Sequence, residues 1–580
     1  MKERWFIKSF KGDFKRISDK YGISEITARL LVNRGIRTDT EIEEYLNAEK
    51  AELSEPSLMY DLDKACGILA ESIKENNKIR IIGDYDVDGV CSTYILYDYF
   101  KNIGASVSFD IPDRVQDGYG INENIIDKAY SDGVEVIMTC DNGIAAYNQI
   151  THAKKLGLTV IVTDHHDIPI GTPLPPADAV IDPKREDCDY PFKGLCGAGV
   201  AYQLIRHFAK KYCKKKKFTL KDIEKRYLAF TALATVCDVM ELKRENRTIV
   251  KKGLNAIRDT ENTGLKALLK VAEIEDEEEI KVYYCGFILG PMINVSGRLE
   301  SAKKALELFL TDDMDEALLK AEKLKALNNE RKDITEQSIR MAVEAAESEE
   351  YKDDKVLVIL LSDCHESIAG IVAGRIKERF NKPSLIFTYA ERGIKGSGRS
   401  IEEYNMFEEI SKCSECFSKF GGHPMAAGFT LDGDTEEEQK ANFYKLKKKL
   451  NENTKLNEED LKPKVSFDME LPLVYATEEL INEMSVLEPF GTGNPAPLFA
   501  KRDVYVQDMR ILGKNRNVVK LTLTDMKDGK IYSGIIFGDS VSFTDYLNKK
   551  EGKKLDIIYR PEINEYNGRR SVQIKIENYR

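Results

Sequence analysis

The clearest hydrophobic pattern of the chain lies between residues 78 and 183, where short apolar runs alternate with longer mixed stretches. The runs occupy residues 79–82, 107–111, 134–138, 158–162 and 179–181. Helix-like stretches separate the first four runs. This alternation predicts a parallel sheet with helices on both faces. Ligands of such sheets bind at the carboxyl ends of the strands, so we expect a functional site there.

Helices are predicted on either side of this α/β core. Residues 1–50 contain amphipathic segments at 25–33 and 38–46, and residues 199–345 are mainly helical. The stretch 314–347 is rich in Ala, Leu, Lys and Glu, which indicates long helices that join two lobes.

Two further patterns complete the chain. A second, smaller α/β pattern begins with an apolar strand at 355–361 and ends near residue 430. Charge-rich residues 435–464 are expected to separate it from the remainder. From Val465 onward the chain alternates in strand fashion, and Asn567-Gly568 is typical of a hairpin turn. We therefore expect a small C-terminal β-barrel.

Composition narrows the class of protein. A chain of 580 residues implies three or four domains of about 100–200 residues each. A net charge of −11 argues against a protein that coats DNA through its overall charge, but it allows a local basic channel. Cys413 and Cys416 form one CxxC pair, but no partners that would complete a zinc site lie near it in the sequence, and the scattered cysteines fit a reducing cytosol. Without a signal-like N-terminus or a run of roughly 20 apolar residues, a cytoplasmic protein with no membrane contact is expected.

Acidic and imidazole side chains follow three of the predicted strands. After the strands at 79–82, 134–138 and 158–162 come, respectively, Asp84, Asp86 and Asp88; Asp141; and Asp164, His165 and His166. The tips of parallel strands lie side by side, so these groups should converge. Such concentrated negative charge is costly unless cations neutralise it. Oxygen and imidazole ligands without thiolates favour Mn²⁺, Mg²⁺ or Zn²⁺, and two ions about 3.5–4 Å apart would suit displacement at phosphorus.

Each motif also has a plainer interpretation when taken alone. The repeated aspartates could form a calcium loop, Asp141 could cap a helix, and the paired histidines could satisfy a turn. Their joint occurrence at successive strand tips favours a metal site. Asp238, which follows the apolar run 227–236, could complete it.

The sequences GDYDVDG, TCDNGI and TDHH resemble motifs of the DHH phosphoesterase superfamily, named for Asp164-His165-His166 here. The resemblance continues over nearly the whole chain through GLCGAG, ALATVCD, ENR, NVSGR, GSGRS, GGHPMAAG, PFG and NEYNGR. Their order is similar to that of the bacterial single-strand-specific 5′→3′ exonucleases of this superfamily. The resemblance implies an N-terminal helical segment, a DHH catalytic domain, a helical linker, a DHH-associated domain and an OB-fold nucleic-acid-binding domain, at residues 1–50, 51–250, 251–350, 351–460 and 461–580.

The resemblance also implies roles for individual residues. The expected ligands of two Mn²⁺ or Mg²⁺ ions are Asp84, Asp86, Asp88, Asp141, His165 and Asp238. Asp141, Asp164, His165 and His166 are the expected catalytic groups, with His166 touching the scissile phosphate. Many relatives carry a histidine where this chain has Ile82, which leaves the direct role of Asp84 open.

A substrate site is implied in the second lobe. Arg114, Ser397 and Arg399 would bind a terminal 5′-phosphate, because the planar guanidinium meets phosphate oxygens in pairs. Arg298 and His423 would contact the same or the next phosphate. The family's Trp-His-x-Gly turn is replaced by Cys364-His365-Glu366-Ser367, so its contacts are not carried over.

The C-terminal barrel resembles an OB-fold, whose groove holds single strands on aromatic platforms. The candidates are Tyr505, Tyr532, Phe537, Tyr566, Arg569 and Arg570, with barrel core as the alternative for each aromatic. The lysine run 214–217 is interpreted as a solvated loop.

By resemblance, the chain is expected to be a monomeric 5′→3′ exonuclease of single-stranded DNA in repair and recombination, supplied by a helicase and a single-strand-binding protein. One alternative is a DHH phosphoesterase acting on pyrophosphate, cyclic dinucleotides or short RNA, which would not explain the β-rich third domain. Another is a non-catalytic replication scaffold, against which the retained Asp141, Asp164, His165 and His166 argue.

Overall fold

The apolar runs of the first α/β pattern form a five-stranded sheet. Its strands are β2 (Ile79–Ile82), β3 (Val107–Asp110), β4 (Val136–Thr139), β5 (Thr159–Thr163) and β6 (Ala179–Ile181). They lie in the order β3-β2-β4-β5-β6, and every pair of neighbours is parallel. The computed structural model describes residues 3–114, 118, 120–169, 171–213, 218–390, 393–513, 515–566 and 568–580. The predicted parallel sheet is confirmed.

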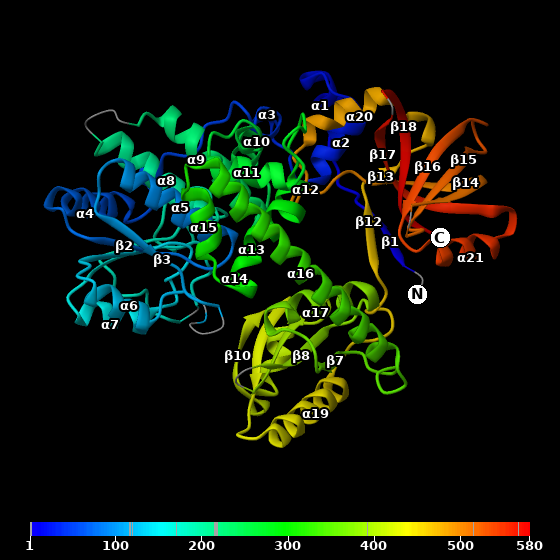
Figure 1. Ribbon diagram of the computed structural model, residues 1–580. Coiled ribbons are helices and arrows are strands. Elements are labelled where there is room, and N and C mark those ends of the chain that lie inside the picture. The colour runs from blue at the N-terminus through cyan, green and yellow to red at the C-terminus, as the bar shows by residue number, and fades with distance from the viewer. Residues whose placement is uncertain are drawn as a thin grey trace.

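Helices cover both faces of this sheet because its strands are apolar on both sides. Ile81 and Met138 pack in one core with α4 (Leu62–Glu75), α5 (Val87–Asn102) and α8 (Gly197–Lys211). Their neighbours Ile82 and Ile137 face the opposite core, with α6 (Glu123–Ser131) and α7 (Tyr147–Lys155). Figure 1 shows the sheet between these two layers.

A helical region follows the sheet and connects it to the second lobe. Its last helix, α16 (Met314–Glu347), is one continuous helix of 34 residues where the sequence predicted several. Ala317 and Leu324 pack in the core of the first lobe, whereas Ala342 and Ala346 pack in the second. The preceding helices are α9 (Leu220–Cys237), α10 (Arg244–Arg258), α11 (Thr263–Val271), α12 (Val282–Tyr284), α13 (Gly290–Asn294), α14 (Ser296–Leu299) and α15 (Lys303–Leu310).

The second lobe is a five-stranded sheet covered by two helices. Its order is β10-β11-β9-β8-β7, formed by β7 (Leu357–Leu361), β8 (Ser384–Ala390), β9 (Gly393–Arg399), β10 (Phe417–His423) and β11 (Ala426–Leu431). The prediction that residues 435–464 separate two domains is wrong for its first part. Residues 436–453 form α19 (Glu436–Asn453), whose Phe443, Leu446 and Leu450 pack in the core of this sheet. Charged residues dominate the composition of α19, but Phe443, Leu446 and Leu450 are three and four residues apart and therefore lie on one face of the helix.

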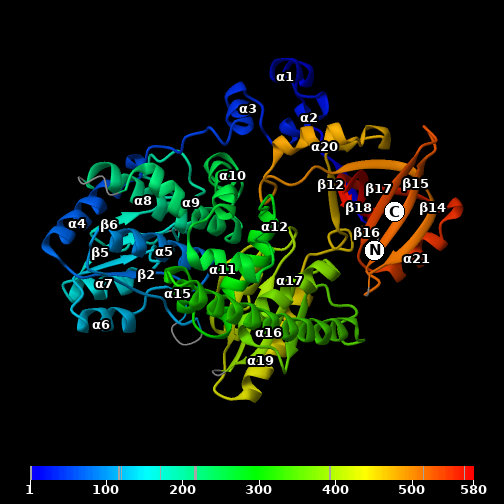
Figure 2. The same ribbon diagram turned by 45° about the horizontal axis from the view of Figure 1, so that its top comes forward.

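The C-terminal sheet has the order β13-β14-β15-β16-β18-β17, and β14 also pairs with β17. Its long strands are β14 (Phe499–Leu512), β15 (Val518–Asp525), β16 (Ile531–Phe537), β17 (Lys554–Tyr566) and β18 (Arg569–Tyr579). The extra pairing joins β17, at the end of the order, to β14, near its beginning. Figure 2 shows this barrel-like lobe apart from the first sheet.

The N-terminal segment belongs physically to the C-terminal lobe. Helices α1 (Phe14–Tyr21), α2 (Glu25–Asn33) and α3 (Asp39–Leu46) share a hydrophobic core with β14–β18. A short strand that the sequence did not reveal, β1 (Arg4–Ile7), pairs in parallel with β12 (Lys464–Phe467). The five-part division of the chain stays a prediction.

One buried cation joins these lobes. Arg247 of α10 is 1% exposed and donates to the backbone oxygens of Tyr45, Val486 and Leu487 at 3.2, 2.9 and 3.0 Å. Its guanidinium also lies 3.8 Å from the centre of the Tyr45 ring.

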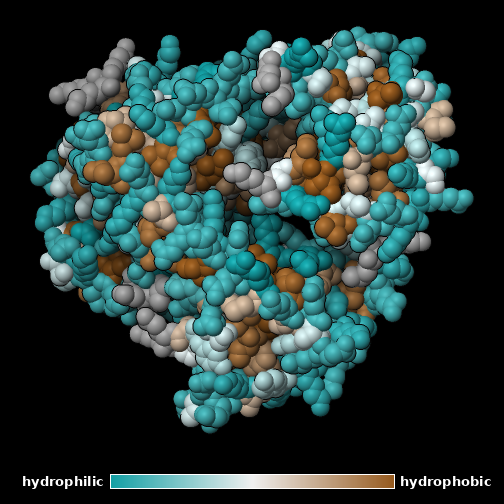
Figure 3. All heavy atoms as spheres, turned by 45° about the vertical axis from the view of Figure 1, so that its right-hand side comes forward, coloured by the Kyte–Doolittle hydropathy of each residue, from teal (hydrophilic) through white to brown (hydrophobic). Residues whose placement is uncertain are grey.

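Figure 3 shows a recess near the centre of the molecule. Among the described residues, no helix is both long and apolar enough to cross a membrane.

Candidate metal centre and phosphate site

The predicted acidic and imidazole groups converge at the carboxyl edge of the first sheet. The Nε2 atom of His165 lies 3.0 Å from Asp141 Oδ1, 3.5 Å from Asp88 Oδ2 and 3.7 Å from Asp238 Oδ2. Asp88 lies in α5, Asp141 follows β4, and Asp238 follows α9, so carboxylates from three separate parts of the fold surround one imidazole nitrogen.

Three overlapping groups of side chains could each hold a cation. Within each group the ligand atoms lie within 4.8 Å of one another, and the groups are Asp84, Asp86 and Asp141; Asp88, His165 and Asp238; and Asp141, Asp164, His165 and His166. Asp141 and His165 each belong to two groups. Shared ligands of this kind fit two neighbouring ions.

The electrostatics of the cluster favour a cation. Burial, followed by the charge of Asp86, raises the pKa of Asp84 to about 8, and burial with the charge of Asp88 raises the pKa of Asp238 to about 8. The pKa of buried Asp141 also lies well above its ordinary value, again through burial and then Asp88. Burial lowers the pKa of His165, which keeps its imidazole neutral. Crowded carboxylates and a neutral imidazole form a suitable ligand set for Mn²⁺ or Mg²⁺.

The loop after β2 is held by helix ends. Asp86 caps α5, since its Oδ1 accepts from the backbone nitrogens of Asp88 and Gly89 at 2.9 and 3.1 Å. The two oxygens of Asp88 accept from Gly197 and Ala198, the first residues of α8, at 2.6 and 2.7 Å. Helix N-termini favour anions, so both helices stabilise the charged loop.

The Asp141 backbone adopts a conformation that few residues tolerate. Its φ is +62°, in the left-handed region where Asn and Asp are enriched. The neighbouring Asn142 is fully buried and fixes this turn: its amide donates to Ile82 O at 3.1 Å, and its Oδ1 accepts from Ile121 N at 3.1 Å. Asn142 therefore positions Asp141, a role that sequence reasoning missed although it lies in the quoted motif.

The Asp164 carboxylate is occupied by hydrogen bonds from its own turn and from the loop after β4. Its Oδ1 accepts from His165 N at 2.7 Å and lies 2.7 Å from His166 Nδ1, while its Oδ2 accepts from Ile144 N at 2.8 Å. Burial lowers the pKa of His166, but the hydrogen bond and charge of Asp164 outweigh it and raise that pKa to about 9. This geometry fits a positioning role for Asp164 and a cationic His166.

Arginines gather beside the loop after β2, residues 83–88, which carries Asp84, Asp86 and Asp88 and is called the metal loop below. The Arg114 guanidinium lies 4.9 Å from the centre of the Tyr85 ring, and Arg298 donates to Ser367 O in the second lobe at 2.7 Å. Burial and then the charges of Arg114 and Arg331 lower the pKa of Arg298 to about 10. Burial and then Arg114 lower the pKa of Arg399 as well. These cations are close enough to repel one another, which an anionic ligand would relieve.

The remaining predicted phosphate ligands lie on the second sheet. Ser397 Oγ accepts from Arg399 Nη1 at 3.1 Å, and a β-carbon on Gly370 would come within 3.0 Å of Ser397 Oγ. Gly370 belongs to the first turn of α17 (Ala369–Phe380), so a helix N-terminus adjoins this pair. His423 ends β10, and after Lys184 its charge helps to lower the pKa of Asp167.

Curated relatives match this chain over its full length. It is 34% identical over 593 residues to the single-stranded-DNA-specific exonuclease RecJ of Bacillus subtilis, a match that covers 100% of this chain and 71% of that protein. It is 33% identical over 566 residues to the Escherichia coli exonuclease of the same name, covering 95% of each. The chain belongs to the RecJ family.

Domain and structure comparisons agree with membership of the RecJ family. The family models for the DHH family N-terminal domain, the DHHA1 domain and the RecJ OB domain match residues 78–235, 353–454 and 467–578. The crystal structure of RecJ in complex with Mn²⁺ from Thermus thermophilus matches 100% of this chain and 79% of its own, with a TM-score of 0.82 and 25% identity. The predicted DHH core and C-terminal OB domain are confirmed.

The residues of the OB domain that were predicted to stack on nucleobases stay predictions. Tyr532 donates to Asp528 Oδ2 at 2.5 Å, Phe537 is 55% exposed beneath Lys575, and Arg570 lies 3.5 Å from Glu478. Tyr505 is half-buried and Arg569 is exposed. The Tyr566 side chain, Asn567 of the predicted hairpin turn and residues 214–217 lie outside the described part of the chain.

Two charged residues near the site were missed from the sequence. Asp182 follows β6, so the same strand-tip reasoning would have found it; it is 1% exposed, and its Oδ2 has no hydrogen-bond partner among the described residues. Burial raises its pKa to about 7. Arg331 of α16 joins the arginine cluster, and no local motif marks it.

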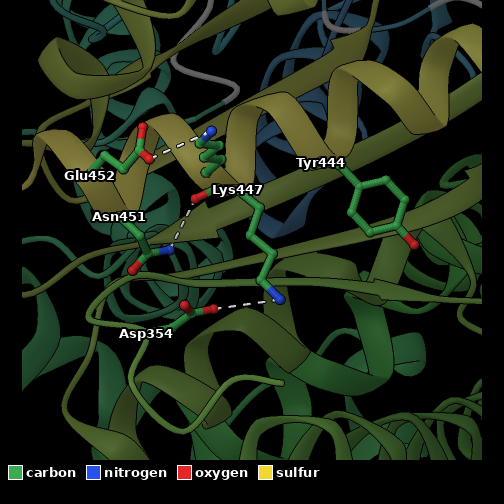
Figure 4. A pocket seen from close by; sticks show the side chains of 6 residues that line it. Asp354, Tyr444, Lys447, Asn451 and Glu452 are labelled. Atoms are coloured by element: carbon green, nitrogen blue, oxygen red, sulfur yellow. Dashed lines mark hydrogen bonds and ion pairs between the residues drawn. The ribbon is translucent and has the colours of Figure 1, made fainter. Parts of the chain in front are cut away.

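A pocket of about 330 Å³ lies elsewhere, beside α19 (Figure 4). Its Lys447 points to Asp354, whose Oδ2 is 3.6 Å away, and lies 2.7 Å from Glu350. The cation is thus already neutralised, and the candidate site remains the metal loop.

Proposed function

We propose that this chain is a metal-dependent nuclease that removes nucleotides from the 5′ end of single-stranded DNA. The observation that carries the proposal is the meeting of two charge clusters. Buried carboxylates surround His165 on the first lobe, and mutually repelling arginines lie beside them, between Tyr85 of the metal loop and Ser367 of the second lobe. One cluster fits cations and the other fits phosphate. The relatives in Bacillus subtilis and Escherichia coli are named as single-stranded-DNA-specific exonucleases.

The carboxylates and His165 would hold Mn²⁺ or Mg²⁺, the two ions found in the Thermus thermophilus RecJ complexes. The ligands are Asp84, Asp86, Asp88, Asp141, His165 and Asp238. When bound, two such ions lower the pKa of the attacking water and neutralise charge on the phosphoryl oxygens. His166, protonated below its pKa of about 9, can donate a hydrogen bond to the scissile phosphate. Asp164 holds the His166 ring in place.

The direction of cutting would come from the arginine side. Arg114, Arg298, Ser397 and Arg399 would bind the terminal 5′-phosphate, and His423 would contact the next one. Fixing the end of the strand places the neighbouring phosphodiester at the metal loop. Because these contacts are to phosphates, cutting should depend little on sequence.

The alternatives account for less of the molecule. A small-molecule phosphoesterase would need the metal cluster but not the RecJ OB domain matched at residues 467–578. A scaffold that had lost its metals would not need a converged His165, Asp88 and Asp141. Action in repair and recombination, helicase and strand-binding partners, a monomeric state and a cytoplasmic location stay predictions.

Digestion of DNA labelled at either end tests the proposal. Single-stranded and duplex substrates are incubated with Mn²⁺, with Mg²⁺ and with chelator. We expect mononucleotides from the 5′ end of the single strand only, and none with chelator. The Asp141→Asn variant keeps the left-handed turn but should lose hydrolysis while still binding DNA. Asp127→Asn, at an exposed carboxylate paired with His152, is the matched control. Full activity of Asp141→Asn would refute the site.

A further inference from the structure

Two aromatic rings stand exposed at the beginning of the helical run 282–299. Tyr283 of α12 is 59% exposed, and Phe287, in the wide turn Cys285–Leu289, is 66% exposed. Their ring centroids lie 5.2 Å apart with 22° between the ring planes, so the rings stack on each other. Large apolar side chains left together at a surface usually mark a binding site.

The helical run connects the C-terminal lobe to the metal loop. At its beginning, a β-carbon on Gly491 would lie 3.7 Å from Val282 Cγ1. Toward its end, Asn294 Oδ1 accepts from the backbone nitrogen of Val87 at 3.0 Å, and Val87 is the residue that follows Asp86. Arg298 then reaches Ser367 of the second lobe. Figures 1 and 2 both show α12 centrally, between the first lobe and the barrel-like lobe.

The aromatic pair and the phosphate site lie on the same side of this run. Arg298 follows Phe287 by eleven residues, a spacing of about three turns that returns near the same face although residues 285–289 form a wider turn. Pro291, Asn294 and Arg298 are each partly exposed on this face, although Asn294 and Arg298 also make the contacts to Val87 and Ser367 given above. At 1.5 Å per residue, Phe287 lies about 17 Å along the axis from Arg298.

We infer that Tyr283 and Phe287 form a stacking platform for a nucleobase of the bound single strand, several nucleotides inward from its 5′ end. The inference rests on the proposed function. A ligand that uses this face must offer an anion to Arg298 and a flat apolar surface to Phe287. A nucleic acid strand carries both, whereas an apolar peptide or a second copy of this chain would leave the arginine unexplained. Stacking accepts every base, which suits an enzyme that must pass any sequence.

Truncation of the rings tests the platform. Tyr283→Ala and Phe287→Ala should each weaken binding of a 5′-phosphorylated 20-nucleotide strand about 5- to 150-fold, the usual range for one base stacked on an aromatic ring. KM should rise with kcat nearly unchanged, and cleavage of a dinucleotide should be unaffected. Tyr283→Phe and Phe287→Tyr keep the rings and should behave as wild type. Tyr130→Ala, at a tyrosine 53% exposed on α6, is the matched control.

An abasic scan identifies the nucleobase itself. A single abasic nucleotide is moved along the strand, and affinity is measured at each position. Wild type should lose affinity at one or two internal positions, and the Tyr283→Ala/Phe287→Ala double variant should lose this position dependence. If the wild type and the double variant lost affinity at the same positions of the abasic nucleotide, the inference of a stacking platform would be wrong. It would also be wrong if the oligomeric state, measured by light scattering, changed without a change in DNA affinity. Wild type that cleaves no single strand at all would instead refute the proposed function.

Discussion

Gly197 lies against Asp141 so closely that a β-carbon at position 197 would come within 2.7 Å of the Asp141 β-carbon and 2.9 Å of its Oδ1. Gly197 also donates its backbone N–H to Asp88. The Gly197→Ala variant must therefore displace a predicted ligand. We expect hydrolysis to fall about 10²-fold and the free energy of unfolding to fall by about 1–3 kcal/mol. Steady-state rates with Mn²⁺ and urea denaturation measure these two effects.

Gly374→Ala provides the control for that substitution. Gly374 lies inside α17, and a β-carbon there would have no neighbour within 4 Å among the described residues. Alanine favours a helix interior over glycine by about 0.5–1 kcal/mol, so this variant should be slightly more stable and fully active. If Gly197→Ala were equally active, the close approach to Asp141 would have no functional meaning.

Arg399→Ala should reduce the preference for 5′-phosphorylated ends. Hydrogen bonds to charged groups contribute about 1.5–3 kcal/mol, so kcat/KM for a 5′-phosphorylated strand should fall about 10- to 150-fold. The value for a 5′-hydroxyl strand should change little. Arg340→Ala, at an exposed arginine of α16, is the matched control. If kcat/KM fell equally for the 5′-phosphorylated and the 5′-hydroxyl strand, Arg399 would bind the strand in general and not its terminal phosphate.

The metal-free protein should lose stability as pH rises. The pKa values of Asp84 and Asp238 rise from 3.8 to about 8 in the folded protein. Between these values the folded protein binds more protons than the unfolded chain, so its free energy of unfolding falls with increasing pH. Mn²⁺ needs the deprotonated ligands and should reverse the trend. Thermal unfolding at pH 5 and pH 8, with chelator or with Mn²⁺, measures this.

The Asp238→Asn variant removes one of the two carboxyl groups whose pKa is raised. With chelator present, the stability of this variant should therefore depend less on pH than that of the wild type. A metal-free Tm that stays constant, or that rises between pH 5 and pH 8, would contradict the raised pKa of these carboxylates.

Arg247→Met should loosen the C-terminal lobe while leaving the metal loop intact. The substitution removes three hydrogen bonds to backbone oxygens of the N-terminal and C-terminal segments. We expect KM for long strands to rise several-fold, dinucleotide cleavage to stay unchanged, and hydrogen exchange to increase in residues 486–494. Arg258→Met, at an exposed arginine of the same helix that pairs with Asp259, is the control. An unchanged KM with unchanged exchange would show that the lobes hold together without Arg247.

Much of the first lobe could be predicted because its evidence is local. The strand-tip residues Asp88, Asp141 and His165 follow apolar runs, and parallel pairing alone brings them together. Asn142 and Gly197 act through backbone geometry that no spacing reveals. Arg331 reaches its place only through the course of a 34-residue helix.

Long-range pairing explains what the sequence concealed. The strand Arg4–Ile7 is too short and too exposed to carry a pattern, and its partner Lys464–Phe467 lies far along the chain. Such pairings depend on distant residues, not on local propensity. The same limit applies to α19, where the charges hid the apolar positions that contact the sheet.

The shared core of the first and last segments constrains how the chain is made. The apolar faces of α1, α2 and α3 leave the ribosome long before the β-strands that will cover them. At about 5–20 residues per second, the intervening chain of more than 400 residues takes roughly 20–90 s to synthesise. During that interval the nascent N-terminus presents uncovered hydrophobic surface, so this segment is where a chaperone would be needed.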